Sequence, residues 1–254
     1  MSPVRPAFVA GNWKMNGALA TNAALLEKLR AGLSVCKTME VAVFPPFPYL
    51  DQAARLLSGA TLALGAQDVS IHAAGAYTGE VAATMLVEFG CRHALVGHSE
   101  RRSLHQETDA LVAQKFGAAQ AAGLIPVLCL GETLAERQVG ETLTVVMRQL
   151  EAVLARYGVH SLANAVLAYE PVWAIGAGRT ATPEAAQAVH LALRQQVALR
   201  DAAIAEKLRI VYGGSVKADN AAQLFAAPDI DGALVGGAAL NADEFLAICR
   251  AVNP

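Results

Sequence analysis

One carboxylate, that of Glu170, stands where the backbone cannot continue as a helix or a central strand. Glu170 follows the apolar run V-L-A-Y, and Pro171 lacks the amide hydrogen that a helix or central strand needs. Glu170 is therefore expected at a strand tip. The Gly-spaced segment 173–178, called the lid below, follows it and resembles a loop that closes over a site. Glu170 is thus a candidate catalytic group, although an ordinary surface loop has the same composition.

Two other segments carry groups that could act with this carboxylate. Asn12 and Lys14 stand in G-N-W-K-M-N-G, and His98 stands in G-H-S-E-R-R. His98 precedes residues that can open a helix, whose positive end favours the neutral imidazole. Taken singly, the lysine is an ordinary surface residue, the asparagine a turn residue and the histidine a structural one. Only convergence in space would make them a site.

Two Gly-Gly turns also follow apolar runs and precede helical segments. One is Gly213-Gly214, followed by Ser215, and the other is Gly236-Gly237. Backbone N–H groups at both turns can point at one anion, as in the phosphate sites that many barrels build after their last two strands. Together the turns predict a phosphate group on the ligand, which a single turn would not.

The elements that must position these groups repeat along the whole chain. Helical segments, the longest at 183–207, alternate with short apolar runs that lack polar alternation, so both faces of the resulting sheet are covered and its strands are parallel. About eight such units predict a single-domain (β/α)₈ barrel over residues 1–254, whose strand ends all face one side. We expect strands at 7–11, 41–44, 62–66, 93–96, 125–130, 165–169, 209–212 and 232–235.

Composition limits the partners and the compartment. The net charge of −2, from 20 basic and 22 acidic residues, indicates no basic surface for nucleic acid or an anionic membrane. A small-molecule partner is therefore expected. No window reaches about 18 uninterrupted apolar residues, and no signal segment is evident. The four cysteines are scattered and the six histidines lack metal-binding spacing, which predicts a reducing, cytoplasmic location and no metal.

Several motifs together resemble one family, the triosephosphate isomerases. The resemblance spans residues 8–252, and two of the motifs are highly specific, G-N-W-K-M-N-G and A-Y-E-P-V-W-A-I-G. The others are Q-D-V-S with A-Y-T-G-E-V, V-G-H-S-E-R-R, C-x-G-E-T-L, Y-G-G-S-V and V-G-G-A. The resemblance implies a (β/α)₈ barrel that interconverts dihydroxyacetone phosphate and glyceraldehyde 3-phosphate in glycolysis and gluconeogenesis, without a metal or other cofactor.

The resemblance also implies a role for each matching residue. Glu170 would be the base, His98 the neutral electrophile, Lys14 the fixed positive charge and Asn12 a hydrogen-bonding partner of the substrate. The remaining matches fall into two groups, a supporting group comprising Glu100, Ser99 and Cys129, and a phosphate-binding group comprising Gly176, Ser215, Gly236 and Gly237. Moving a proton between adjacent carbons does require one base, one electrophile and a fixed cation, and no redox cofactor.

The chain departs from the family pattern at three positions, and other functions were weighed. Ala177 and Arg179 stand where the family more often has Thr and Lys, and Tyr77 replaces a common Phe. These changes bear on lid kinetics more than on the reaction. Another phosphate-binding barrel enzyme would lack N-W-K-M-N, and a non-catalytic phosphosugar-binding barrel would have lost Lys14, His98 or Glu170.

One long connection predicts the assembly. Segment 67–80, from Gln67 to Glu80, carries mainly apolar side chains and few charges, and loops of this length are usually functional. Left exposed on a monomer, it would promote aggregation. The resemblance implies that it docks beside Asn12 and Lys14 of a second copy, with Thr78 near the neighbouring site. We therefore expect an obligate homodimer.

Overall fold

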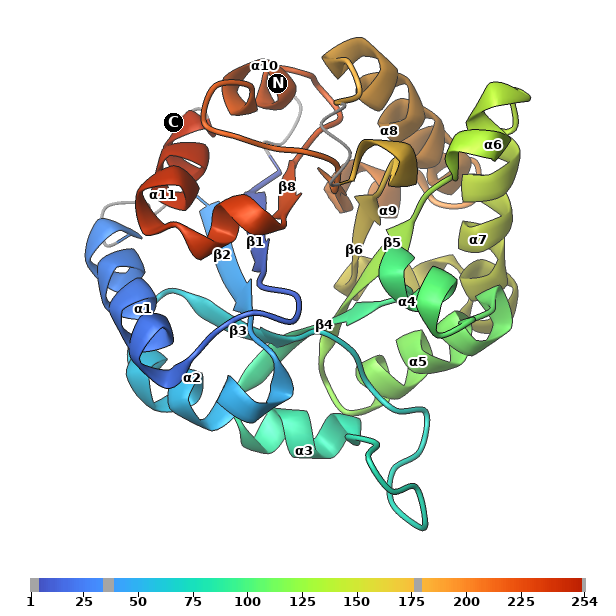
Figure 1. Ribbon diagram of the computed structural model, residues 1–254. Coiled ribbons are helices and arrows are strands. Elements are labelled where there is room, and N and C mark those ends of the chain that lie inside the picture. The colour runs from blue at the N-terminus through green and yellow to red at the C-terminus, as the bar shows by residue number, and fades with distance from the viewer. Residues whose placement is uncertain (1–4, 34–38, 176–179, 253–254) are drawn as a thin grey trace.

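The strands form a closed barrel in which every neighbouring pair is parallel (Figure 1). The computed structural model describes residues 5–33, 39–175 and 180–252. The expected eight-stranded parallel barrel is confirmed, with strand bounds within two residues of those expected. The strands are β1 (Ala7–Asn12), β2 (Met39–Phe44), β3 (Ala63–Ala66), β4 (Cys91–Val96), β5 (Ile125–Leu130), β6 (Val166–Tyr169), β7 (Arg209–Tyr212) and β8 (Gly232–Val235).

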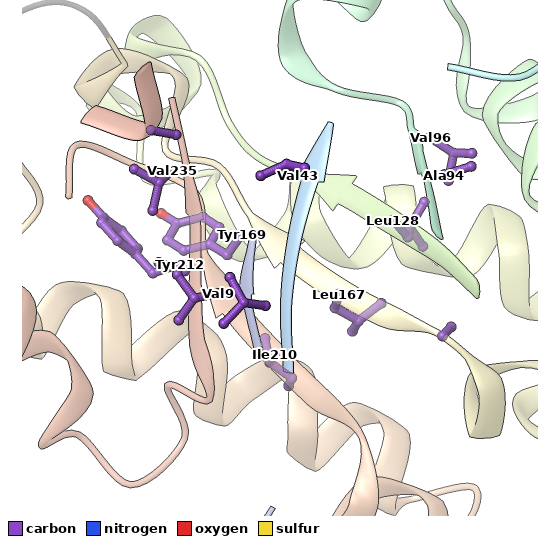
Figure 2. Packing of buried hydrophobic residues seen from close by; sticks show 14 of the residues in the cluster. Val9, Val43, Ala94, Val96, Leu128, Leu167, Tyr169, Ile210, Tyr212 and Val235 are labelled. Carbon is purple, nitrogen blue, oxygen red and sulfur yellow. The ribbon is translucent and has the colours of Figure 1, made fainter. Parts of the chain in front are cut away.

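Successive strand residues alternate between two separate apolar cores. In β1, Phe8 and Ala10 belong to a cluster made of strand residues alone, which fills the barrel, whereas Val9 belongs to the larger cluster shared with the helices. Figure 2 shows part of this outer core, with Val9 and Val43 among the labelled side chains. Because both faces are buried against apolar neighbours, the strands read as continuous apolar runs.

The helices form a ring around the barrel (Figure 1). The described α-helices are α1 (Leu19–Leu33), α2 (Leu50–Leu57), α3 (Ala83–Glu88), α4 (Ser99–Leu104), α5 (Asp109–Ala121), α6 (Leu134–Gln138), α7 (Thr142–Tyr157), α8 (Pro183–Ala198), α9 (Ala202–Lys207), α10 (Ala221–Phe225) and α11 (Ala242–Ala251). Short 3₁₀ turns are η1 (Phe47–Tyr49), η2 (Val159–Asn164), η3 (Val172–Ala174) and η4 (Gly237–Leu240).

The single helix expected over 183–207 is wrong. Asp201 is extended, with φ −156° and ψ 107°, and its side chain accepts a hydrogen bond from the Ile204 N–H at 3.0 Å. The first helix ends at Ala198, and Asp201 caps α9, because an aspartate at this position satisfies a donor that the helix itself cannot. The short helix α6 was not anticipated, although Thr133 and Glu136 at its start form a capping box.

The connection between β3 and α3 projects away from the barrel (Figure 1). Its first part is anchored, since Val69 and Ser70 are buried, whereas residues 73–80 are all exposed. Within it the His72 and Tyr77 rings stack at 3.5 Å, which leaves Tyr77 45% exposed. The connection therefore projects as an apolar loop that is stabilised by contacts within itself. Among the described residues, none of the helices is long and apolar enough to span a bilayer.

Candidate active site at the carboxyl ends of the strands

One pocket of about 310 Å³ opens at the carboxyl ends of the strands. Segments from β1, β4, β6, β7 and β8 contribute to it, although they are far apart in the sequence. Its lining includes all four residues predicted to be catalytic and most of those predicted to bind phosphate. The lining residues are Asn12, Lys14, His98, Glu170, Ile175, Gly213, Gly214, Ser215, Val216, Lys217, Leu234, Gly236, Gly237 and Ala238.

Glu170 follows β6, as predicted, but it is buried and not exposed. Only 2% of the residue is accessible. One carboxylate oxygen, Oε2, accepts the Ser99 N–H at 2.8 Å, and the other, Oε1, lies 3.0 Å from Nε2 of His98. Burial alone would raise the pKa of Glu170, but the His98 ring, the Ser99 N–H and the Lys14 ammonium hold it below its ordinary value. Glu170 is therefore ionised at neutral pH.

His98 caps helix α4 and presents one ring nitrogen to Glu170. Its Nδ1 accepts the Glu100 N–H at 3.2 Å, which leaves the ring proton on Nε2. In this arrangement Nδ1 carries no proton, and two opposing influences act on the pKa of the ring. Burial lowers the pKa of His98, but the Glu170 carboxylate, joined by Glu100, raises it above the ordinary value. The two carboxylates thus outweigh the effect of burial on the pKa of His98.

Lys14 lies across the pocket in a backbone conformation that lysine rarely adopts. Its φ is 53°, in the left-handed region. Its N–H donates to Oδ1 of Asn12 at 2.9 Å, and its Nζ pairs with Oε1 of Glu100. Asn12, only 5% exposed, also lines the pocket, so it both shapes the Lys14 turn and faces the ligand space.

The residues predicted to have supporting roles lie directly beside these groups. Glu100 bonds Lys14, and its other oxygen lies 3.7 Å from Nδ1 of His98, so it sits between the two. Ser99 supplies the N–H that holds Glu170. Cys129 is fully buried in the barrel interior, where burial and the nearby Glu170 carboxylate raise the pKa of its thiol. The thiol is therefore protonated and contributes packing.

The Gly-Gly turns line the pocket, but the glycines serve different purposes. A Cβ on Gly213 would lie 2.7 Å from Cγ of Glu170, so this glycine makes room for the carboxylate. A Cβ on Gly214 would lie 2.2 Å from the Tyr212 hydroxyl. Gly236 and Gly237 stand at the start of η4, and no atom lies within 4 Å of a Cβ built on Gly237. That end is therefore open to a ligand. The predicted phosphate-binding Gly176 lies outside the described residues, as do Ala177 and Arg179.

Glu132 belongs to the motif C-x-G-E-T-L, for which no role of this residue was predicted. The residue is fully buried, and its carboxylate accepts hydrogen bonds from the Trp173 ring at 2.9 Å and the Tyr169 hydroxyl at 3.1 Å. The Arg137 guanidinium lies 4.3 Å from the Trp173 ring centre. Glu132 thus anchors the entry to the lid. Its position after β5, where strand ends converge, was the available signal.

Gln67 was assigned only to the expected interface connection. Its amide nitrogen donates to the carbonyls of Lys14 and Phe44, each at 2.8 Å. No sequence pattern near Gln67 points to Lys14, because the two residues lie on different strand ends and meet only when the barrel closes. In the described part of the chain, acidic, cysteine and histidine side chains form no group of three suited to a metal ion.

These features define a class of protein: a (β/α)₈-barrel enzyme with a carboxylate–imidazole pair, a fixed lysine and a glycine-lined end around one pocket. The triosephosphate isomerase family model matches residues 7–252. A triosephosphate isomerase of Dechloromonas aromatica is 63% identical over 250 residues, covering 98% of this chain and all of that one. That of Thiobacillus denitrificans is 62% identical over 248 residues, covering 98% and 99%.

A solved structure agrees with these relatives. The crystal structure of triosephosphate isomerase from Bartonella henselae superposes with a TM-score of 0.89 at 40% identity, covering 97% of this chain and 98% of that one. The chain belongs to the triosephosphate isomerase family, and it is an isomerase.

Proposed function

We propose that this chain interconverts dihydroxyacetone phosphate and D-glyceraldehyde 3-phosphate, with Glu170, His98, Lys14 and Asn12 acting on the substrate. The observation that carries the proposal is the placement of the Glu170–His98 pair and the Lys14 side chain around one pocket with a glycine-lined end. The same reaction serves glycolysis and gluconeogenesis.

Each group has a distinct part in the proposed reaction. Glu170 takes the proton from the carbon next to the carbonyl, and the His98 Nε2–H donates to the carbonyl oxygen, which yields an enediol or enediolate. Glu170 then returns its proton to the neighbouring carbon, while the hydroxyl on the first carbon gives its proton back to His98 and becomes the new carbonyl. One carbon is oxidised as its neighbour is reduced, so the reaction needs no redox cofactor. The Lys14 ammonium stabilises the developing negative charge, and the Asn12 amide orients the substrate oxygens.

Glu170 must leave its resting position before it can act. In the resting arrangement the Ser99 N–H and the His98 ring hold its carboxylate and lower its pKa. When the side chain moves to the substrate it gives up these partners but stays buried, so its pKa rises and it becomes a stronger base. Ser99 and Glu100 therefore support the site by holding the resting carboxylate and the Lys14–His98 side of the pocket.

The substrate phosphate is proposed to bind at the opposite end of the pocket. Ser215, Gly236 and Gly237 line the pocket, and Gly236 and Gly237 open the short helix η4, so their backbone N–H groups are proposed to bind the phosphate. An anion at such a position is favoured by the helix dipole and by unpaired N–H groups. Gly176 of the lid is proposed as a further phosphate ligand.

A direct assay tests the proposed reaction. Purified protein is given glyceraldehyde 3-phosphate with a metal chelator, and product is followed by a glycerol-phosphate dehydrogenase reporter. We expect turnover that the chelator does not reduce. Binding of the triose phosphate without turnover would favour the non-catalytic phosphosugar-binding alternative.

We further propose one catalytic domain over residues 1–254 and a homodimer formed through segment 67–80. The exposed, apolar part of this segment, including Tyr77, projects from the barrel and is suited to insertion into a second copy. Sedimentation should give a dimer, and replacing Tyr77 with Asp should weaken it. A fully active monomer at nanomolar concentration would contradict the proposal.

A cytoplasmic location is also proposed. Charged phosphate esters do not cross a bilayer unaided, because a charged group is costly to transfer into hydrocarbon. The enzyme must therefore share a compartment with its substrates. Fractionation of source cells, with activity measured in each fraction, tests this assignment.

A further inference from the structure

The strained turn at Lys14 needs support from outside its own segment. A non-glycine residue with a φ of 53° persists only where its surroundings hold it there. The Asn12 side chain holds the Lys14 N–H at 2.9 Å, but this contact lies within the turn itself. The Lys14 carbonyl is held by Gln67, which is 53 residues away in the sequence.

Gln67 joins three neighbouring strand ends through a single amide group. Its nitrogen donates to the Lys14 carbonyl after β1 and to the Phe44 carbonyl at the end of β2, both at 2.8 Å, while its own backbone follows β3. An amide NH₂ has two hydrogens, and each of these carbonyls accepts one. A carboxylate or an apolar side chain at this position could make neither bond.

The backbone at Gln67 is fixed by ion pairs of the next residue. The next residue, Asp68, bonds the Lys115 ammonium at 2.7 and 2.8 Å and lies 2.9 Å from the Arg101 guanidinium. Lys115 is 5% exposed, so this pair is shielded from solvent. The Gln67 side chain therefore extends from an anchored part of the backbone and can hold the Lys14 turn in place.

We propose that Gln67 is a positioning residue for the reaction: by holding the Lys14 carbonyl it sets where the Lys14 ammonium lies relative to His98 and Glu170. This inference rests on the role of Lys14 given under the proposed function. Gln67 does not line the pocket, and its amide bonds the Lys14 backbone, so it acts on the reaction through Lys14. A displacement of about 1 Å at a catalytic group can cost about 100-fold in rate.

The chain offers a closely matched control. Gln120 is also partly buried, and its amide nitrogen also bridges two backbone carbonyls, those of Ser161 at 2.6 Å and Asn164 at 3.1 Å. Neither carbonyl belongs to the pocket. Gln67→Met and Gln120→Met therefore remove the same pair of hydrogen bonds at similar burial, and only the first removes them from the Lys14 turn.

The test is a double-mutant cycle on kcat and KM. We expect Gln67→Met to lower kcat/KM by roughly 10- to 100-fold, and Gln120→Met to change it by less than about 2-fold although both lose stability. In a Lys14→Met background, assayed at high enzyme concentration, Gln67→Met should cause no further loss, because a residue that acts only through Lys14 has nothing left to position. If Gln67→Met fails to fold, Gln67→Asn, which keeps the amide but is too short to reach both carbonyls, takes its place.

The outcomes separate this inference from the proposed function. An equal loss from Gln67→Met with and without Lys14 would overturn the inference and indicate a role in stability alone. So would activities of Gln67→Met and Gln120→Met that match each other, provided that Lys14→Met is itself impaired. If Lys14→Met retained full activity, the proposed role of Lys14 and this inference would both fall.

Discussion

Glu170 is both buried and ionised. It is ionised because Ser99 and His98 bond it. It fits in a buried position because Gly213 and Gly131 beside it have no side chains. A Cβ on Gly131 would lie 1.7 Å from the Glu170 carbonyl oxygen. The sequence shows both glycines, but it does not show that they make space for Glu170.

Glu170→Gln should abolish most of the activity and leave the fold intact. The amide has the same shape, so packing survives and the Ser99 N–H keeps an acceptor, whereas the base is lost. We expect kcat to fall by about 10²- to 10⁴-fold, with a small change in the midpoint of thermal unfolding. Both quantities are measured on the same preparation. Activity within a few-fold of the parent would show that Glu170 is not the base.

Gly213→Ala should impair catalysis by displacing the carboxylate. The new methyl group would lie 2.7 Å from Cγ of Glu170, so the side chain must shift. We expect kcat to fall by roughly 10-fold or more. Gly117→Ala is the comparison, because its methyl group would lie 2.1 Å from the Tyr157 hydroxyl, away from the pocket. That variant should lose stability and keep its kcat, and an equal effect of both on kcat would count against this reading.

At the scale of elements, the strand ends and the short helices that follow them build the site. β4 runs directly into α4, so His98 becomes the cap of that helix and Ser99 its first residue. β6 runs into η3, whose Trp173 is tied to Glu132 after β5. The lid therefore begins from a fixed point on a neighbouring strand end. Its entry is set by a buried carboxylate and not by the lid sequence alone.

Trp173→Phe should loosen the lid while keeping the ring over which Arg137 lies. The variant loses the 2.9 Å hydrogen bond to Glu132. An enediolate exposed to water can expel its phosphate, so we expect a lower kcat and a larger fraction of substrate converted to methylglyoxal and free phosphate. Tyr169→Phe removes a different donor from the same carboxylate and should leave that fraction unchanged. Equal product ratios in the two variants and the parent would show that this bond does not serve the lid.

At the scale of the whole molecule, two buried histidines lie away from the reaction. His190 is fully buried beneath Tyr169, and His93 is fully buried in the lower barrel beside Glu40 and the Phe8 ring. Burial, aided by Arg194, lowers the pKa of His190 to about 4, and burial likewise lowers the pKa of His93 despite the Glu40 carboxylate. Both side chains are neutral in the folded protein at neutral pH.

The free energy of unfolding should therefore fall in mild acid. The unfolded chain binds a proton at each of these positions below its ordinary pKa of about 6.5, whereas folded His190 does not until about pH 4, so stability is complete above pH 6.5 and is lost as the pH falls. From pH 7 to 5 the His190 contribution is roughly 2 kcal/mol. Denaturant unfolding of the parent, of His190→Phe and of the exposed-site control His160→Ala measures it. A slope unchanged in His190→Phe would contradict this account.

Much of this architecture could be predicted from local patterns. The eight apolar runs, their lack of polar alternation and their regular spacing indicated a parallel closed sheet, because only burial on both faces allows such runs. The rule that strand ends converge then brought Asn12, Lys14, His98 and Glu170 to one face, and the structure places all four in one pocket. Residues 183–207 were wrongly predicted as one helix, because a cap at Asp201 depends on a local extended backbone that helix propensity does not reveal.

What the sequence by itself determined was the periodicity, the identity of the chemical groups and the order of the strand ends. These follow from local propensity and from the burial of apolar side chains, which neighbouring residues settle among themselves. Only the tertiary structure decided that Glu170 is buried, that two carboxylates raise the pKa of His98, and that Gln67 holds Lys14. Burial, electrostatic environment and hydrogen bonding depend on which distant segments meet, and barrel closure alone brings these together.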